Sequence, residues 1–241
     1  MRPEFSRDVS HIRKRIRRFL AWQESSEGTW RFFGNGSGLA PDLDTSACAA
    51  AALLESRHGD SARSYALPGQ ALQKACRETA SSRETFDGLF FRAGQSNALR
   101  YFALTGLETE ELADELRGEI VRGGSGGNRS LFLFTLVRAH LQGSLDGLDS
   151  IREAVIDETL QCLDPVAGAR EPLTAAMATH ILLDLGHEDG LFGQRVEALL
   201  DRLAPVHTRR FEALGDPNCG SAALTTAMIL SAIAKAGGIC E

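Results

Sequence analysis

Apolar residues recur at helical spacing along almost the whole chain, and this periodicity constrains the fold more than any other feature. It is clear in residues 11–22, where arginines take the face opposite Ile12, Ile16, Phe19 and Leu20. Patterns typical of strands are scarce. Further helices are expected over residues 47–54, 68–80, 96–105, 109–122, 129–142, 148–163, 171–185, 191–203 and 220–236. The sequence therefore predicts an all-α protein.

The connections between the expected helices are short and polar. Glycine-rich runs at 34–38 and 123–127 mark turns, a pattern that is typical of stacked helical hairpins. An acidic-glycine-x-aromatic turn within 27–33 recurs weakly within 87–92. Such an echo is expected of a helical-repeat or toroidal architecture. Because no clear change in composition divides the chain, one domain over residues 1–241 is predicted.

Charge and cysteine usage restrict the classes of partner. The net charge of -6 and the isoelectric point near 5.6 argue against a nucleic-acid partner. The five cysteines are odd in number, widely spaced and form no CxxC pair, which predicts reduced thiols in a cytoplasmic protein. Neither a signal peptide nor a membrane-spanning helix is expected.

Two carboxylates stand two residues apart in Asp42-Leu43-Asp44-Thr45-Ser46, just before an alanine-rich helix. Burying both is costly unless they share a proton. In an extended lead-in, residues i and i+2 face the same side, so Asp42 and Asp44 are expected to form a pair that holds one proton. In the competing interpretation, Asp44 is only the N-cap of the helix and Asp42 is a solvated loop charge.

Two segments carry a resemblance to a known family. Arg18-Phe19-Leu20, Gln23 and Gly28-Thr29-Trp30 resemble the glutamine–tryptophan repeat of squalene–hopene cyclases and related class II terpene cyclases, with one extra residue between the glutamine and the glycine. Residues 41–47 resemble the DxDD acid motif of these enzymes, with Thr45 at the last aspartate. Residues 86–90 and 218–226 are similar to later parts of the repeat. The resemblance implies an α/α toroid, reduced or incomplete at 241 residues.

The resemblance also implies a reaction. Class II cyclases protonate an alkene or epoxide, and neighbouring double bonds capture the carbocation. In this sequence Asp44 corresponds to the acid, Asp42 to its partner, and Thr45 offers a hydroxyl that tunes the site. The positive end of the following helix would stabilise the carboxylate that remains after proton transfer. The substrate class is a small apolar isoprenoid, linear or carrying a diphosphate.

Substrate contacts follow from the same resemblance. Aromatic faces stabilise a carbocation, and the expected wall residues are Trp30, Phe33, Phe90 and Phe91. A diphosphate would be bound by cationic side chains, for which the candidates near the aromatic turns are Arg31, Arg92 and Arg100; a solvated surface position is the default interpretation for each. Asn97 is a candidate hydrogen-bonding group in the cavity, or a helix-start residue. Protonation requires no metal, and Mg²⁺ enters only with a diphosphate-bearing substrate.

Other functions are open at this point. No DDxxD segment is present, which argues against metal-dependent diphosphate ionisation. A zinc-dependent prenyltransferase would need Asp, Cys and His ligands; His180 and Asp184 are four apart with His187 nearby, but no cysteine accompanies them. The main alternative is a non-catalytic or degenerate α/α-toroid domain that binds a partner.

Overall fold

The computed structural model describes residues 3–31, 41–55, 66–78, 88–122, 129–163, 172–187, 194 and 222–239. Over these residues the elements are helices and no strand occurs, which confirms the all-α class. The chain divides into two compact units, Met1–Leu112 and Ala113–Glu241. The toroidal arrangement and the single domain over residues 1–241 stay predictions.

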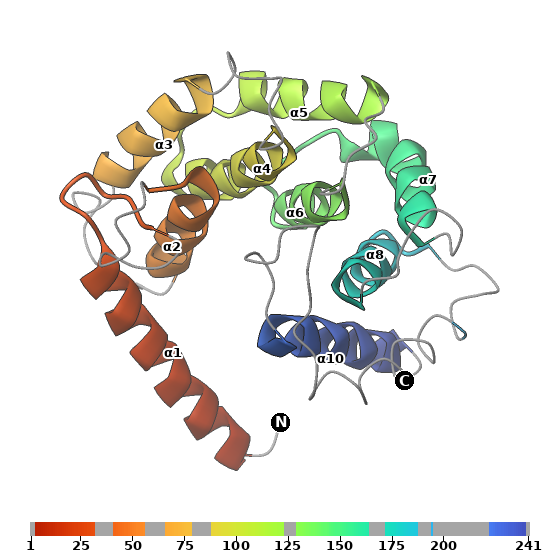
Figure 1. Cartoon of the computed structure of the whole chain (residues 1–241), viewed down its shortest axis with the longest axis horizontal. Helices are drawn as coiled ribbons and strands as arrows, with labels where there is room; N and C mark the ends of the chain where they lie inside the picture. Colours follow the sequence, from red (N-terminus) through yellow and green to blue (C-terminus); the bar gives the residue numbers. More distant parts are fainter. Residues whose placement is uncertain are drawn as a thin grey trace. The chain divides into compact units, whose positions relative to one another are not determined.

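The first unit is built around α2. Its helices are α1 (Pro3–Gln23), α2 (Leu43–Glu55), α3 (Ala66–Glu78) and α4 (Gly88–Thr105). Helix α2 packs on α1, α3 and most extensively on α4 (Figure 1). The core that these helices share is formed by Trp30, Leu72, Tyr101, Phe102 and the buried alanines of α2. Burial of these side chains is the main force that holds the unit together.

Small residues allow α2 and α4 to approach closely. On α2 the buried positions facing the core are mostly alanines, and on α4 Gly94 lies directly against the first residues of α2. A Cβ atom at Gly94 would come within 3.0 Å of the Asp44 nitrogen and 3.1 Å of the Leu43 Cγ. Glycine at this position therefore sets how closely α4 approaches the beginning of α2.

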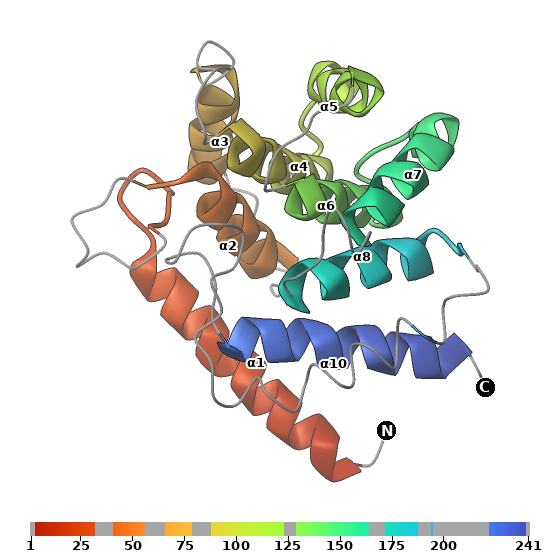
Figure 2. The same cartoon turned by 45° about the vertical axis from the view of Figure 1, so that its right-hand side comes forward.

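The second unit is arranged around α8 (Pro172–Asp184). Its other elements are α5 (Glu110–Arg122), α6 (Arg129–Leu141), the 3₁₀ helix η4 (Leu148–Ile151), α7 (Arg152–Leu163) and α10 (Ala222–Ile239). Helix α8 packs on α6, α7 and α10 (Figure 2). The expected helix at 191–203 lies outside the described residues except for Gln194.

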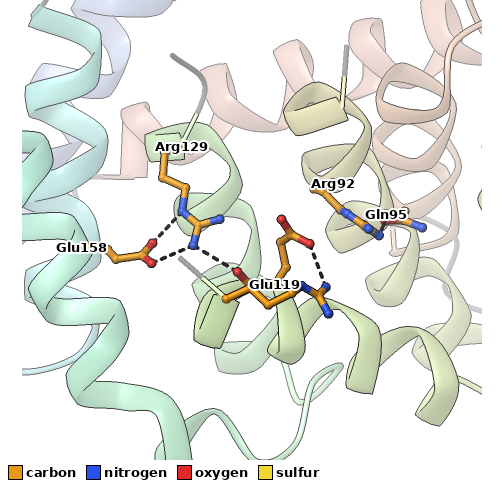
Figure 3. Close-up of polar contacts among 6 residues, drawn as sticks. Arg92, Gln95, Glu119, Arg129 and Glu158 are labelled. Carbon is orange, nitrogen blue, oxygen red and sulfur yellow. Dashed lines mark hydrogen bonds and ion pairs between the residues drawn. The ribbon is translucent and has the colours of Figure 1, made fainter. Parts of the chain in front are cut away.

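A partly buried ion pair joins α6 to α7 in this unit. The Nε and Nη2 atoms of Arg129 donate to the two carboxylate oxygens of Glu158 at 2.6 and 2.8 Å (Figure 3). The guanidinium also donates to the Glu119 carbonyl on α5 at 3.4 Å and stacks over the Phe132 ring. Such a bidentate pair fixes the orientation of the two side chains and also contributes to stability.

Among the helices that the structure describes, none is long and apolar enough to cross a lipid bilayer. The sequence led to the same expectation.

The contact at Gly94 gives a first prediction. Gly94→Ala is expected to lower the free energy of unfolding by ~1–3 kcal/mol, because the new methyl group meets backbone that cannot move independently. The matched control is Gly118→Ala in α5, where the added Cβ meets only the flexible Arg122 side chain at 3.5 Å. That change is expected to raise stability by ~0.5–1 kcal/mol. Urea unfolding of both variants measures the difference, and equal effects would contradict the close packing.

Candidate active site

Helix α2 begins at Leu43, and Asp42 is its N-cap. The Asp42 Oδ1 accepts a hydrogen bond from the Thr45 backbone nitrogen at 2.7 Å, and the Ser46 nitrogen donates to the Asp42 carbonyl at 3.1 Å. Asp44 therefore lies within the first helical turn. The lead-in is therefore helical from Leu43 rather than extended through Asp44. The pairing of the Asp42 and Asp44 carboxylates stays a prediction. An aspartate does cap α2, as the competing interpretation expected, but the capping residue is Asp42 rather than Asp44.

Trp30 ties the segment before α2 to the core. Its backbone nitrogen donates to the Ser46 Oγ at 2.9 Å, and its carbonyl accepts from that hydroxyl at 3.2 Å and from the Asp42 nitrogen at 3.3 Å. Its indole Nε1 donates to the Leu20 carbonyl at 2.7 Å. With 2% of its surface exposed, Trp30 is a core residue; that it also lines a substrate cavity stays a prediction.

Asp44 is held by α4. The Asn97 Nδ2 donates to the Asp44 Oδ1 at 2.6 Å, across the contact that Gly94 makes possible. Asp44 is partly buried and Asn97 is buried. This hydrogen bond and the positive end of α2 both stabilise the ionised carboxylate. The sequence singled out Asn97 as a hydrogen-bonding group, and the structure supplies its partner.

The second oxygen of Asp42 is buried without a hydrogen bond. No donor among the described residues contacts Asp42 Oδ2. A buried carboxylate oxygen without a donor is costly, and most such atoms in proteins are paired. The first turn of α2 and its N-cap thus carry two carboxylates. Asp44 accepts a hydrogen bond from Asn97, and the Oδ2 atom of Asp42 accepts none from the described residues.

The three arginines lie in different places. The Arg100 Nε donates to Glu55 at 2.8 Å, at the opposite end of α2 from Asp44. The Arg92 Nη1 donates to Gln95 at 2.7 Å, and both side chains are buried (Figure 3). At ~100° per residue, Arg92 lies on nearly the opposite side of α4 from Gly94. Only Arg31, which follows Trp30 and is partly buried, is next in sequence to the network at the head of α2.

The remaining aromatic candidates are not placed by side chain. Phe33 lies outside the described residues. Phe90 and Phe91 lie in α4, where the structure describes their backbone but not their side chains. The sequence interpretation missed the structural roles of Ser46 and Gly94. An isolated glycine in a helical pattern often marks close packing, and this signal could have identified Gly94. Nothing in the sequence pattern joined Ser46 to Trp30.

The histidine and aspartate considered as zinc ligands have other neighbours. Asp184 forms an ion pair with Lys235 of α10, and the His180 ring meets Phe134 edge-on at 5.9 Å between centroids. Burial, followed by the nearby Lys235 charge, lowers the pKa of His180. In the described part of the chain no three His, Cys, Asp or Glu side chains gather as a metal site.

The second unit also has an open hollow of about 470 Å³ along α5, η4 and α7. Four carboxylates line it, Asp149, Glu153, Asp157 and Glu158. Ile120, Val121, Ile151 and Ala154 line the same hollow, and Glu158 is paired with Arg129 and Glu153 with Arg152, so its surface is mixed polar and apolar.

No protein-family model matches the sequence, and comparisons with curated proteins and with solved structures give no match. The fold and the site define an all-α chain with a polar cluster where α2 begins. The resemblance to class II cyclases, carried by residues 18–30, 41–47, 86–90 and 218–226, stays a prediction.

The cap at Asp42 gives a second prediction. Asp42→Ala is expected to lower the free energy of unfolding by ~0.5–2 kcal/mol, because the Thr45 nitrogen loses its acceptor. Asp42→Asn should stay close to the parent, since asparagine caps helices about as well. Thermal and urea unfolding of the two variants measure the difference. If Asp42→Ala were as stable as Asp42→Asn, the capping role would be refuted.

Burial of His180 gives a third prediction, on pH. Its pKa is lowered in the folded chain from 6.5, so the unfolded chain takes up this proton first as pH falls. The stabilising contribution is complete above pH 6.5 and is lost below it. His180→Gln, which does not titrate, should show a weaker fall in stability with acidification. Unfolding free energies of both proteins on either side of pH 6.5 test this, and parallel curves would contradict it.

Proposed function

We propose that the chain is a class II terpene cyclase that begins the cyclisation of a linear isoprenoid, or of an isoprenyl diphosphate, by protonation from Asp44. The observation that carries the proposal is the Asp44 carboxylate in the first turn of α2, with Asn97 donating to its Oδ1 at 2.6 Å. In this proposal the hydrogen bond and the positive end of α2 stabilise the carboxylate that is left after proton transfer. A proton placed on such a group is readily given up.

The proposed step moves one proton and one electron pair. A protonated Asp44 transfers its proton to one carbon of an alkene, the π electrons form the new C–H bond, and the second carbon becomes cationic. A neighbouring double bond then attacks this cation and closes a ring. Loss of a proton to water, or addition of water, ends the sequence. Asp44 is left as the carboxylate that Asn97 and the helix end stabilise.

Asp42 and Thr45 have supporting roles in this scheme. Asp42 caps α2 through Oδ1, while its buried Oδ2 accepts no hydrogen bond from the described residues. We keep for Asp42 the role of partner to the acid, which the resemblance implies. Thr45 donates its backbone N–H to Asp42 and so positions the carboxylate. Its hydroxyl stands where the related motif has a third aspartate.

The proposed substrate wall is aromatic. Trp30, Phe33, Phe90 and Phe91 remain the proposed aromatic wall. For a diphosphate, Arg31, Arg92 and Arg100 remain the proposed cationic ligands, and Arg31 is the one that directly follows Trp30 in the sequence. Mg²⁺ belongs to the scheme only if the substrate carries a diphosphate. A cytoplasmic location also remains a proposal.

A second candidate is a non-catalytic helical domain that binds a partner. It is favoured by one observation: the Asp42 side chain already serves as the N-cap of α2, a role that needs no chemistry. In this alternative the Asp44–Asn97 hydrogen bond serves only to join α2 to α4.

The fourth prediction separates the two. Asp44→Asn should reduce turnover by about a hundredfold or more, because the amide cannot donate an acidic proton. It retains an oxygen that can accept from Asn97, so the fold should be preserved. The protein is incubated with squalene, farnesyl diphosphate and geranylgeranyl diphosphate, and products are identified by gas chromatography–mass spectrometry after phosphatase treatment.

The matched control is Asp114→Asn on α5, whose carboxylate lies at the surface beside Arg117. It should leave turnover unchanged. Cyclic product from Asp44→Asn at the parent rate would refute the assignment of the acid. A parent protein that forms no cyclic product from any of the three substrates would favour the binding domain.

A further inference from the structure

Helix α1 exposes large apolar side chains near its end. Ile16, Phe19 and Trp22 are 51%, 56% and 74% exposed, and the Phe19 and Trp22 ring centroids lie 6.4 Å apart. Within the first unit, α1 meets its neighbours through its C-terminal end (Figures 1 and 2). There Leu20 packs against the core. The described side chains before it, at 14–19, are exposed to solvent.

The charge of α1 is opposite to that of the remaining chain. Residues Pro3–Gln23 contain six lysines and arginines and two acidic residues, a net charge of +4. Because the whole chain carries -6, the other residues together carry -10. Lys14, Arg15 and Arg18 are all exposed. The cationic charge is therefore concentrated on the helix that also exposes apolar side chains.

The two kinds of side chain are arranged around the helix in a specific way. At ~100° per residue, Ile16 and Phe19 share one face, Arg15 lies next to Phe19 at its edge, and Arg17 lies further round on the other side, as far from this face as Arg18. Lys14 and Arg18 lie on the far side. In the sequence the apolar spacing continues back through Val9 and Ile12. A helix with an apolar face, cationic residues outside it and low overall hydrophobicity is typical of segments that lie in the membrane interface.

We propose that α1 binds the surface of an anionic lipid bilayer. The apolar side chains enter the boundary between headgroups and acyl chains, Trp22 sits at headgroup level, and the lysine and arginine side chains extend to lipid phosphates. Charge complementarity favours this occupant, since an anionic surface attracts α1 while supplying an apolar layer for Phe19 and Trp22. The inference is independent of the proposed cyclisation.

Intrinsic fluorescence provides a direct test, the fifth prediction. Trp22 is exposed whereas Trp30 is 2% exposed, so a change in emission on binding reports Trp22. Vesicles of phosphatidylglycerol and phosphatidylcholine should shift the emission to shorter wavelength and protect it from acrylamide. Vesicles of phosphatidylcholine alone should not. In co-sedimentation, at least about tenfold more protein should bind the anionic vesicles at low salt, and high salt should reduce this.

Double variants test whether vesicle binding depends on the side chains of α1 or is non-specific. Phe19→Ser with Trp22→Ser, and Arg15→Gln with Arg18→Gln, should each abolish most of the binding in co-sedimentation. The controls are Leu104→Ser, an exposed apolar residue of α4, and Arg77→Gln on α3, which should bind like the parent. Circular dichroism checks that all variants are folded.

Three results would overturn the proposal. The first is equal binding to neutral and anionic vesicles, and the second is no binding to either. The third is self-association, measured by light scattering, that Phe19→Ser with Trp22→Ser removes while lipid binding is absent. That last result would assign the face to a second copy of the chain.

Discussion

The close contact between α2 and α4 is the constraint on which the candidate site depends. Gly94 has no side chain to separate the helices, and a Cβ atom there would meet the backbone of Asp44 and the side chain of Leu43. Only at this distance does the short side chain of Asn97 reach the Asp44 carboxylate at 2.6 Å. A larger residue at position 94 would move the donor away from the acid, so the packing and the chemistry of this site are inseparable.

The first turn of α2 combines structural and chemical roles on neighbouring residues. Ser46 and Asp42 bind the Trp30 backbone and hold the segment against the core, and Asp42 also caps the helix. Asp44 is then relieved of the capping role. Its carboxylate interacts with a donor from another helix. This division explains how a short DxDT segment can contribute to stability and still present an acid.

The sequence predicted the all-α class because apolar periodicity is a local property that survives in the fold. It also singled out Asp44 and Asn97, although it offered no way to pair two residues that lie 53 positions apart in the sequence. It placed the beginning of α2 at residue 47, whereas the helix begins at Leu43. The reason is that the segment from Asp42 to Thr45 was interpreted as an acid motif rather than as a helix cap. The pairing of Arg100 with Glu55 was not predictable either, since it depends on which helices pack together.

The account of function rests on a proton that reaches the substrate from the protein, and that proton exchanges with water. The most direct test is therefore incubation of the parent protein with linear isoprenoids in D₂O, followed by mass spectrometry and deuterium NMR of the product. If Asp44 donates the initiating proton, the cyclic product carries a single deuterium at the carbon that was protonated first. A cyclic product without deuterium would show that the cation arises in another way, and would contradict the role proposed for Asp44.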